Sequence, residues 1–428
     1  MKIAVVPDLH LNKSVYKGVK DRDIPSLPFR TVDFMKAFEY VVDKCIQDLH
    51  PDLLIVPGDV YDHPSPSNEV RGFLSSQLEK LTSEKIPVVI LLGNHDVYQK
   101  NHALKDIQEL GLKNIRVIEE PTILKYQDVK FLMFPYSLDI EQKKITIREE
   151  FNKFLATIKE EDDGTPSIFF GHFGVQNAKI NEYIDREFIA NINTETDTNT
   201  TTTEITDEAK KAFRNNNPND ICNDDLDDIG ADYVFLGDYH EFQILGTKKC
   251  IAMYGGSLEK SDFSEIKQTK GFLFYDSDAQ PDEKTGKCRF IECPNCRPMI
   301  ELKGNFDDIK KQFAKEDSTK LKNAIVKISF VGTTDELIAY STGLEGFKKE
   351  LREKIDPVHI ISIQKIKNQA QDEEASKLEK EIMEKGHMEA EDVIKVVKEI
   401  LAEKIKDEKE LEATNVLAQE IYDEVVKG

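Results

Sequence analysis

Five short blocks of potential metal ligands each follow an apolar run in the first 240 residues of this chain. The blocks are Asp8-Leu9-His10, Gly58-Asp59-Val60-Tyr61-Asp62, Gly93-Asn94-His95-Asp96, Gly171-His172 and Gly237-Asp238-Tyr239-His240, after the runs IAVV, LLIV, VVILL, SIFF and YVFL. Such runs are typical of buried strands. Open α/β sheets bind ligands at the carboxyl ends of their strands. One block would arise by chance in many chains, but five in series predict one convergent metal site.

The candidate ligands are carboxylates, imidazoles and one side-chain amide, without a thiolate. This set favours Mn²⁺, Mg²⁺ or Fe²⁺ over structural zinc. We expect Asp59 to bridge two ions, with one oxygen on each. The remaining ligands then divide into Asp8, His10 and His240 on one ion, and Asn94, His172 and Asp238 on the other.

Two such ions predict hydrolytic chemistry on phosphate esters. Ions roughly 3.5–4 Å apart form a clamp for in-line attack of hydroxide on phosphorus. His95 directly follows Asn94 and should point elsewhere in the same turn, where it can protonate the leaving oxygen or stabilise the transition state. Asp62 either orients His95 or is a structural turn carboxylate. The expected catalytic residues are therefore His95 and Asp62.

Length and composition set the broad class. A chain of 428 residues is too long for one ordinary core, which suggests two domains and an appendage. No apolar run approaches the roughly 20 residues needed to cross a bilayer, and the N-terminus enters a strand at once. We therefore expect a soluble cytoplasmic protein, or one of the host-cell interior if viral, without signal peptide. The six cysteines are scattered, and reduced structural roles are favoured over a zinc or redox role for Cys293 and Cys296.

The net charge of −22 does not exclude a nucleic-acid partner, although phosphate binding usually shows as a basic surface. Much of the acid lies in local runs, and a bound metal pair adds positive charge where a phosphate would lie. The loop after the first block is locally basic, with Lys13, Lys17, Lys20 and Arg22. This loop is either an ordinary solvated surface, which is the default, or a contact for a phosphate backbone.

The predicted catalytic domain spans residues 1–297. Strand and helix patterns alternate from Met1 to about Asp278, which predicts a layered α/β sandwich with a mixed sheet. The clearest helix is Thr31–Leu49, with apolar residues at every third or fourth position. Further helices are expected at Asn68–Leu81, His102–Leu110 and Ile147–Ile158. Strands are expected at Asp52–Val56, Pro87–Leu91, Ile115–Ile118, Val129–Phe134, Ser167–Phe170, Tyr233–Leu236, Cys250–Tyr254 and Gly271–Tyr275.

Three further segments complete the predicted organisation. Residues 191–220 are rich in Asn and Thr and are expected to form a flexible surface loop. Residues 298–367 contain two strand patterns, Ala324–Phe330 and His359–Ile363, around a helix at Ser341–Ile355, enough for a small α/β cap. Residues 368–428 are highly charged and helical in pattern. Their apolar stripes either pack on the body or bind another protein, and we favour the partner.

The motifs DLH, GDVYD, GNHD, GHF and GDYH, in this order, resemble the calcineurin-like metallophosphoesterase superfamily. Within it the chain is most similar to SbcD-type DNA double-strand-break repair nucleases, a branch that includes bacteriophage recombination endonuclease subunits. GDVYDHPSPS looks like that branch's loop, and the stretch from Tyr254 to Glu265 followed by Lys270-Gly271-Phe272 looks like its post-catalytic segment. The order of nuclease domain, cap and helical tail also resembles the family's layout.

The resemblance implies a four-layer αββα sandwich and two Mn²⁺ ions, with Mg²⁺ as an alternative. Asp8, His10, Asp59 and His240 would hold one ion, Asp59, Asn94, His172 and residue 238 the other, and His95 would be the catalytic histidine. The family usually has histidine at position 238, so Asp238 is a departure that should dampen the Lewis acidity of the site.

The implied function is a Mn²⁺-dependent nuclease in DNA repair or recombination, acting as an exonuclease on duplex ends and an endonuclease on single-stranded DNA. The implied partners are DNA and an SMC-like coiled-coil ATPase of the SbcC type, bound through residues after 368. Helices at Asn68–Leu81 and His102–Leu110 would form a homodimer within a heterotetramer. Two alternatives remain, a phosphodiesterase or phosphatase for small substrates and a catalytically weakened architectural subunit.

Overall fold

The computed structural model describes residues 1–366 apart from 17–18, 110, 112, 177, 179–220 and 318. The Asn/Thr-rich loop at 191–220 and the helical tail at 368–428 lie outside the described residues. Among the described helices, none has both the length and the apolar character needed to cross a bilayer.

The first sheet has six strands in the order β14-β13-β1-β2-β3-β6. Its strands are β1 (Lys2–Val5), β2 (Leu53–Pro57), β3 (Val88–Leu91), β6 (Ile115–Ile118), β13 (Gly271–Asp276) and β14 (Cys288–Glu292). The strands β1, β2, β3 and β6 run parallel to one another, whereas β13 and β14 are antiparallel to their neighbours. The carboxyl ends of β1, β2 and β3 therefore lie side by side at one edge.

The second sheet also has six strands, in the order β11-β12-β10-β9-β8-β7. Its strands are β7 (Thr122–Tyr126), β8 (Val129–Phe134), β9 (Ser167–His172), β10 (Tyr233–Gly237), β11 (Gln243–Ile244) and β12 (Ile251–Tyr254). The central strands β8, β9, β10 and β12 are parallel. One hydrophobic cluster joins the inner faces of both sheets, with Ile55 of β2 and Phe170 of β9 among its fully buried members, so the sheets pack face to face.

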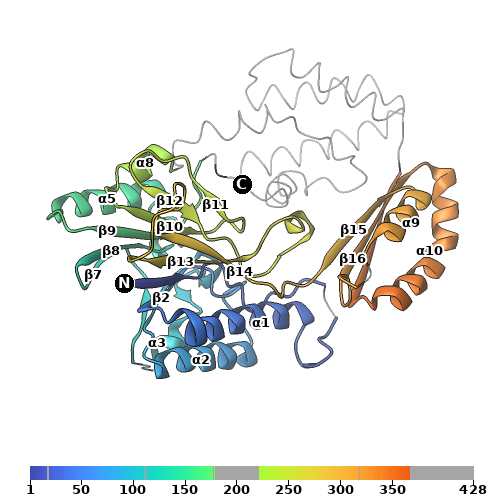
Figure 1. The fold of residues 1–428 in the computed structure, drawn as a ribbon, viewed down its shortest axis with the longest axis horizontal. Coiled ribbons are helices and arrows are strands. Elements are labelled where there is room, and N and C mark those ends of the chain that lie inside the picture. Colours follow the sequence, from blue (N-terminus) through green and yellow to red (C-terminus); the bar gives the residue numbers. More distant parts are fainter. Residues whose placement is uncertain are drawn as a thin grey trace, which may run out of the picture.

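Helices cover both outer faces (Figure 1). On the first sheet lie α1 (Phe29–Lys44), which continues as a short π-helix (Cys45–Leu49), α2 (Asn68–Ser83) and α3 (Lys105–Glu109). On the second sheet lie α5 (Ile147–Glu160) and α8 (Asn223–Asp227). The apolar stripe of α1 accounts for its position, because Phe34, Phe38 and Val41 are fully buried. The prediction of a four-layer αββα sandwich is confirmed.

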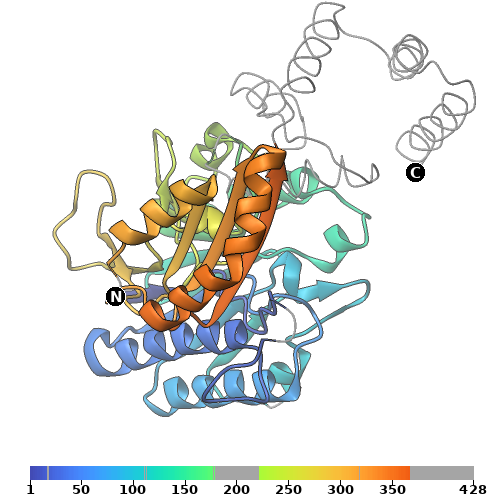
Figure 2. The ribbon, with the colours of Figure 1, turned by 90° about the vertical axis from the view of Figure 1, so that its right-hand side faces the viewer.

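A smaller unit follows the sandwich (Figure 2). It is a parallel sheet of β15 (Met299–Gly304), β16 (Ile325–Gly332) and β17 (His359–Ile366), packed against α9 (Phe306–Lys315) and α10 (Thr334–Ile355). We call this unit the cap. Its sheet contacts the sandwich through Met299 and Ile325, which pack on Phe29. Arg297, just before β15, forms an ion pair with Asp33 of α1.

Several elements differ from the sequence predictions. The helix expected at Ser341–Ile355 begins at Thr334, where Thr333 and Glu336 form a capping box. The helix expected at His102–Leu110 begins at Lys105, because residues 101–102 pair as strand β5 with β4 (Val97–Tyr98). The strands β7, β14 and β15 and the helix α9 were not predicted. The first two are sheet-edge strands with largely half-exposed residues, so they lack the buried apolar run on which strand prediction depends.

Candidate metal centre

The predicted ligands lie together where the strands of both sheets end. Asp8 and His10 follow β1, Asp59 follows β2, and Asn94 follows β3, which are three adjacent strands. On the second sheet, His172 ends β9, while Asp238 and His240 follow the adjacent β10. The two sheets meet at this edge, since Pro57 of β2 accepts a hydrogen bond from His172 of β9 at 2.9 Å. Stacking of two parallel-stranded sheets thus joins residues that are more than 200 positions apart.

Glycines precede four of the candidate ligands, and at each of these glycines an added Cβ atom would lie less than 3.0 Å from a neighbouring atom. A Cβ atom on Gly93 would lie 2.1 Å from Asp59 Oδ1, and one on Gly58 would lie 2.1 Å from His172 Nδ1. Gly58 also has a φ angle of +92°, which residues with a side chain rarely adopt. Positive φ angles occur at four candidate ligands themselves, Asp8, His10, Asp59 and Asp238. Strained backbone of this kind is concentrated at functional sites.

Asp59 lies between two groups of histidines. Its Oδ1 is 3.3 Å from His172 Nε2, and its Oδ2 is 3.6 Å from His10 Nε2. The side chain is almost fully buried. Each oxygen therefore faces a different histidine, which is the arrangement that a carboxylate bridging two cations requires.

The ligand atoms of Asp8, His10 and His240 converge on one side of Asp59, within 4.8 Å of one another. We call these three residues the His240 half of the cluster. The Nε2 atoms of His10 and His240 are only 2.9 Å apart. The Nδ1 of His240 donates to Glu265 Oε1 at 3.0 Å, and the Nδ1 of His10 lies 3.5 Å from Asp62 Oδ1. Both rings therefore turn Nε2 towards the same point, where one ion could bind both.

On the other side of Asp59, His172 converges with Asp59 and Asp8. We call His172, Asn94 and Asp238 the His172 half. The ring of His172 is buried; its Nδ1 donates to the Pro57 carbonyl and its Nε2 donates to Asn94 Oδ1 at 2.8 Å. The amide of Asn94 is thus beside the same nitrogen that would bind a cation.

Asp238 is placed differently from the other predicted ligands. Its backbone N–H donates to Asp8 Oδ1 at 3.0 Å, and its φ angle is 105°. Its carboxylate is absent from the converging groups of metal-binding atoms in the described part of the chain. Its Oδ2 lies against Gly174, 3.3 Å from where a Cβ atom would stand. The structure therefore brings the backbone of Asp238 into the cluster and leaves its carboxylate beside it.

His95 and Asp62 are adjacent, but the contact differs from the one expected. The Nδ1 of His95 donates to the backbone carbonyl of Asp62 at 2.7 Å. The carboxylate of Asp62 instead accepts from Lys13 Nζ at 2.7 Å and faces His10. His95 is half-buried and packs edge-on against the His10 ring, with ring centroids 5.0 Å apart. It thus lies on the more open side of a cluster whose floor is buried.

Burial and neighbouring charges determine which of the candidate ligands are protonated. Burial lowers the pKa of His10 to about 4, against the opposing effect of Asp62. Burial would also lower the pKa of His172, but the charge of Asp59 raises it to about 10. Conversely, although burial favours the neutral acid, the charge of His172 holds the pKa of Asp59 below its usual range. Without metal at neutral pH, His10 is therefore neutral, and His172 forms an ion pair with Asp59.

The residues of the cluster suit divalent cations. Asp8 Oδ2 is buried and has no hydrogen-bond partner, and burial raises the pKa of this carboxyl group. A buried carboxylate oxygen without a partner lacks the positive group that would stabilise its charge. Converging imidazole nitrogens and carboxylate oxygens form a donor set typical of Mn²⁺ and related ions. The donor chemistry and the unpartnered oxygen thus both fit bound metal.

Three buried residues support the cluster and received no role from the sequence. Asp96 is fully buried and accepts backbone hydrogen bonds from Gly93, Val60 and Tyr61, which joins the second block to the third. Glu265 and Lys270 form a buried ion pair behind His240. The position of Asp96 at the end of a block was a usable signal. Glu265 and Lys270 stand in the post-catalytic segment, but nothing in the sequence connects them to His240.

Two features outside the blocks have ordinary structural partners. In the basic loop, Lys13 pairs with Asp62, and Arg22 forms a two-pronged ion pair with Asp356 of the cap at 2.7 and 2.9 Å. These partners favour a structural role for the loop over a phosphate contact. All six cysteines are free, and no cysteine joins a converging metal-binding group in the described segments.

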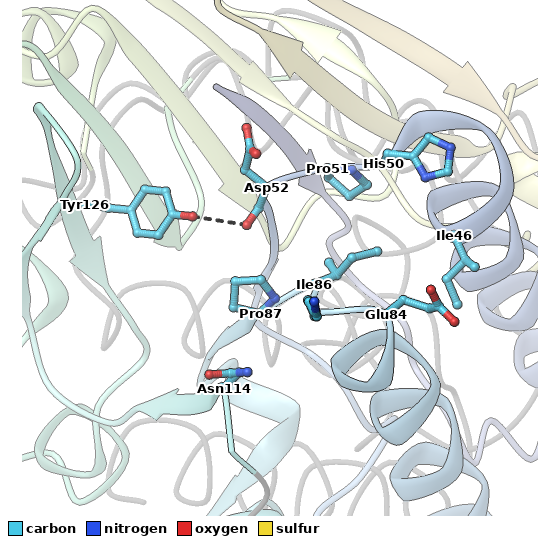
Figure 3. Close-up of a pocket in the computed structure, with 10 residues that line it drawn as sticks. Ile46, His50, Pro51, Asp52, Glu84, Ile86, Pro87, Asn114 and Tyr126 are labelled. Atoms are coloured by element: carbon cyan, nitrogen blue, oxygen red, sulfur yellow. Dashed lines mark hydrogen bonds between the residues drawn. The ribbon is translucent and has the colours of Figure 1, made fainter.

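A separate hollow of about 470 Å³ opens at the opposite edge of the first sheet (Figure 3). Asp52, Pro87 and Asn114 line it, and each directly precedes a strand of that sheet. Tyr126 closes one side by donating its hydroxyl to the Asp52 carbonyl at 3.2 Å. The hollow therefore lies at the amino ends of the strands, and none of the candidate ligands contributes to its lining. The candidate site is the ligand cluster.

Comparisons with known proteins identify the family. Residues 1–242 match the family model described as calcineurin-like phosphoesterase. The chain is 25% identical over 326 residues to the D subunit of the SbcCD nuclease from Staphylococcus epidermidis, covering 72% of this chain and 74% of the relative. It is 26% identical over 286 residues to the protein of the same name from Staphylococcus saprophyticus, covering 63% and 66%. Among solved structures, TT1561 of Thermus thermophilus aligns with a TM-score of 0.37 at 11% identity, covering 68% of this chain and 98% of that one.

Proposed function

This chain belongs to the calcineurin-like phosphoesterase family, and we propose that it is a Mn²⁺-dependent nuclease acting on DNA in repair or recombination. The metal-dependent phosphoesterase activity expected from the sequence follows from membership of the family. The choice of DNA as substrate and of Mn²⁺ as metal rests on the similarity to the SbcCD subunits and on the ligand chemistry.

The observation that carries this proposal is the position of Asp59. One of its oxygens faces His10 and the other faces His172, so the cluster has two halves that share a carboxylate. A site for one structural ion would not need a second converging group. Two halves with imidazole and carboxylate donors are suited to the paired ions that hydrolyse phosphate esters.

Each residue then has a definite task. Bound divalent cations would lower the pKa of an attacking water and neutralise charge on the phosphoryl oxygens. Asp8, His10, Asp59 and His240 would hold one cation, and Asp59, Asn94, His172 and Asp238 the other. The Nδ1–H group of His95 donates a hydrogen bond to the Asp62 carbonyl. The Nε2 atom is then the one that can deliver a proton to the leaving oxygen. The carboxylate of Asp62 restrains His10 and Lys13.

The test is cleavage of DNA by the purified full chain with Mn²⁺ or Mg²⁺. Linear duplex and circular single-stranded DNA separate exonuclease from endonuclease activity, and Asp59→Asn is the inactive control. We expect Mn²⁺ to support degradation of both substrates. Hydrolysis of bis-p-nitrophenyl phosphate without any cleavage of DNA would instead favour the small-substrate enzyme. Two bound Mn²⁺ ions without hydrolysis of either substrate would favour the architectural subunit.

The proposed assembly also includes an SMC-like ATPase bound through residues after 368, with α2 and α3 at a homodimer interface. The sequence pattern of the tail and the names of the relatives support the association with a partner subunit, since those names describe subunits of SbcCD. Truncation after Lys367 should leave metal binding and cleavage of single-stranded DNA intact and abolish co-purification with the ATPase. Loss of metal binding on truncation would show instead that the tail supports the nuclease body.

A further inference from the structure

A buried ion pair lies directly behind His240. Glu265, in the short helix η3 (Phe263–Glu265), accepts from His240 Nδ1 at 3.0 Å through Oε1. Its other oxygen is 2.7 Å from the ammonium group of Lys270. Both side chains are completely shielded from solvent. A carboxylate and an ammonium group are thus buried together against a candidate metal ligand.

The pair holds both the ring and the backbone of His240. Lys270 Nζ donates to the His240 carbonyl at 2.9 Å, to Ser257 Oγ at 3.0 Å and to Gln268 Oε1 at 2.8 Å. Glu265 Oε2 also accepts from the backbone N–H of Ser261 at 2.7 Å. The ring and the carbonyl group of His240 are both hydrogen-bonded to this pair. Rotation of the side chain or displacement of the backbone would therefore break a buried contact.

Stability alone is a poor explanation for such a pair. Buried ion pairs lose hydration on folding, and apolar residues of similar volume often stabilise a protein at least as well. In metal sites, however, a carboxylate behind a histidine fixes which ring nitrogen faces the ion. Here the Nδ1 proton of His240 points to Glu265, which leaves Nε2 to face His10 Nε2 at 2.9 Å.

We propose that Glu265 and Lys270 are positioning residues that hold Nε2 of His240 towards the metal of the His240 half. Glu265 sets the ring orientation, and Lys270 neutralises Glu265 while it fixes the His240 backbone. This proposal rests on the two-metal function proposed above. It goes beyond that function by predicting that loss of the pair lowers the affinity for one ion and leaves the affinity for the other unchanged.

The same segment supplies a matched control. Glu259 is also a buried carboxylate with a cationic partner, since its Oε1 lies 3.7 Å from Arg30. It also accepts from the backbone N–H groups of Arg297 at 2.8 Å and of Lys260 at 2.7 Å. These partners tie Glu259 to α1 and to the start of the cap. Glu259→Gln therefore removes a buried charge of the same segment without touching His240.

The first measurement is Mn²⁺ binding by the full-length protein, with free Mn²⁺ followed by electron paramagnetic resonance. Glu265→Leu should weaken one of two ions by about 10–100-fold and leave the other unchanged. Glu265→Gln keeps an acceptor for Nδ1 and should lose less affinity for that ion than Glu265→Leu does. Glu259→Gln should bind both ions as tightly as the wild type does. Unchanged affinity for both ions in Glu265→Leu would overturn the proposal, as would an equal loss in Glu259→Gln.

The second measurement needs no metal and stays informative if a variant folds poorly or if the proposed function fails. Spectra of ¹⁵N-histidine-labelled, metal-free protein should show a hydrogen-bonded proton on His240 Nδ1 in the wild type. Glu265→Gln should retain this proton, whereas Lys270→Met should shift it because Glu265 loses its neutralising partner. A wild type without a protected Nδ1 proton would refute the positioning role. Failure of the wild type to bind Mn²⁺, with this proton present, would refute the two-metal function alone.

Discussion

The two halves of the ligand cluster are held in place by different kinds of contact. In the His240 half, side-chain carboxylates stand behind the rings, Glu265 behind His240 and Asp62 behind His10. In the His172 half, the group behind the ring is the backbone carbonyl of Pro57. One half therefore depends on particular side chains, and the other on how closely the two sheets approach.

The surroundings of the halves differ in the same way. The helix η3, which carries Glu265, packs on the cap, where Phe263 joins Met299 and Ile325 in one apolar cluster. His172 is instead enclosed by the sandwich, where a Cβ atom on Gly237 would lie 2.2 Å from the Pro57 carbonyl. The His240 half is therefore linked to the cap through η3, whereas the ring of His172 is held between the two sheets. This difference suggests that the two ions respond unequally to substitution.

The largest effect should come from Asp59, whose two carboxylate oxygens face the two halves. Asp59→Asn replaces a charged bridging carboxylate with a neutral amide. The affinity for both ions should therefore fall together. We expect phosphodiester cleavage to fall by roughly 10³-fold or more, because two-metal clamps supply several kcal/mol of transition-state stabilisation. Cleavage assays with Mn²⁺ titration and circular dichroism would check this. Full activity with two ions bound to a folded variant would show that Asp59 does not bridge.

His95 is not among the proposed ligands of either half, so a substitution there should affect the cleavage rate without affecting metal binding. His95→Ala removes the proposed proton donor and should reduce the rate by about 10²–10⁴-fold. The ring Nδ1 of His95 is hydrogen-bonded to the Asp62 carbonyl, and the ring lies beside His10 and the carboxylate of Asp62. Because the proposed ligands of both ions are intact in this variant, both Mn²⁺ ions should remain bound. Rate measurements and metal counting on the same preparation test this directly. Loss of an ion would make His95 a ligand.

The pH dependence of metal binding should sharpen the comparison. Because the pKa of His172 is raised to about 10 in the metal-free protein, a proton occupies this ligand at pH 7 and must leave when metal binds. The apparent affinity of the His172 half should therefore rise with pH, by about tenfold per unit between pH 6.5 and 8.5. In the His240 half, His10, whose pKa is lowered to about 4, contributes no such dependence there, and the carboxyl group of Asp8, whose pKa burial raises to about 7, contributes only in the lower part of this range. Binding titrations at several pH values, compared with His172→Asn, measure the difference; a pH-independent affinity would contradict it.

The smallest effect is expected at Asp238, on the periphery of the His172 half. Its backbone N–H contacts Asp8 while its carboxylate lies against Gly174. Asp238→His should shift preference towards Mn²⁺ over Mg²⁺, because an added imidazole favours the more nitrogen-binding ion. Relative rates with the two metals would report the shift, and Asp238→Asn controls for the loss of charge alone. If neither variant changes metal preference, residue 238 lies outside the coordination sphere.

The sequence determined the sandwich and the identity of most candidate ligands, because both follow from local patterns. Apolar runs such as LLIV predicted strand β2 closely, and the polar residue that follows each run had to lie at a strand end. The periodic apolar positions of α1 likewise predicted a helix covering a sheet. Edge strands such as β7 and β14 escaped prediction because half-exposed residues leave no apolar run.

The tertiary structure alone decided how the ligands are supported. Glu265 contacts His240 only because η3 folds back against the segment that follows β10, and no spacing in the chain encodes that contact. The same is true of Pro57, whose carbonyl reaches His172 because two sheets stack at one edge. Sequence pattern reports what each residue does along its own strand or helix. Which groups meet across strands, sheets and the cap depends on packing between distant segments, and only the folded chain specifies it.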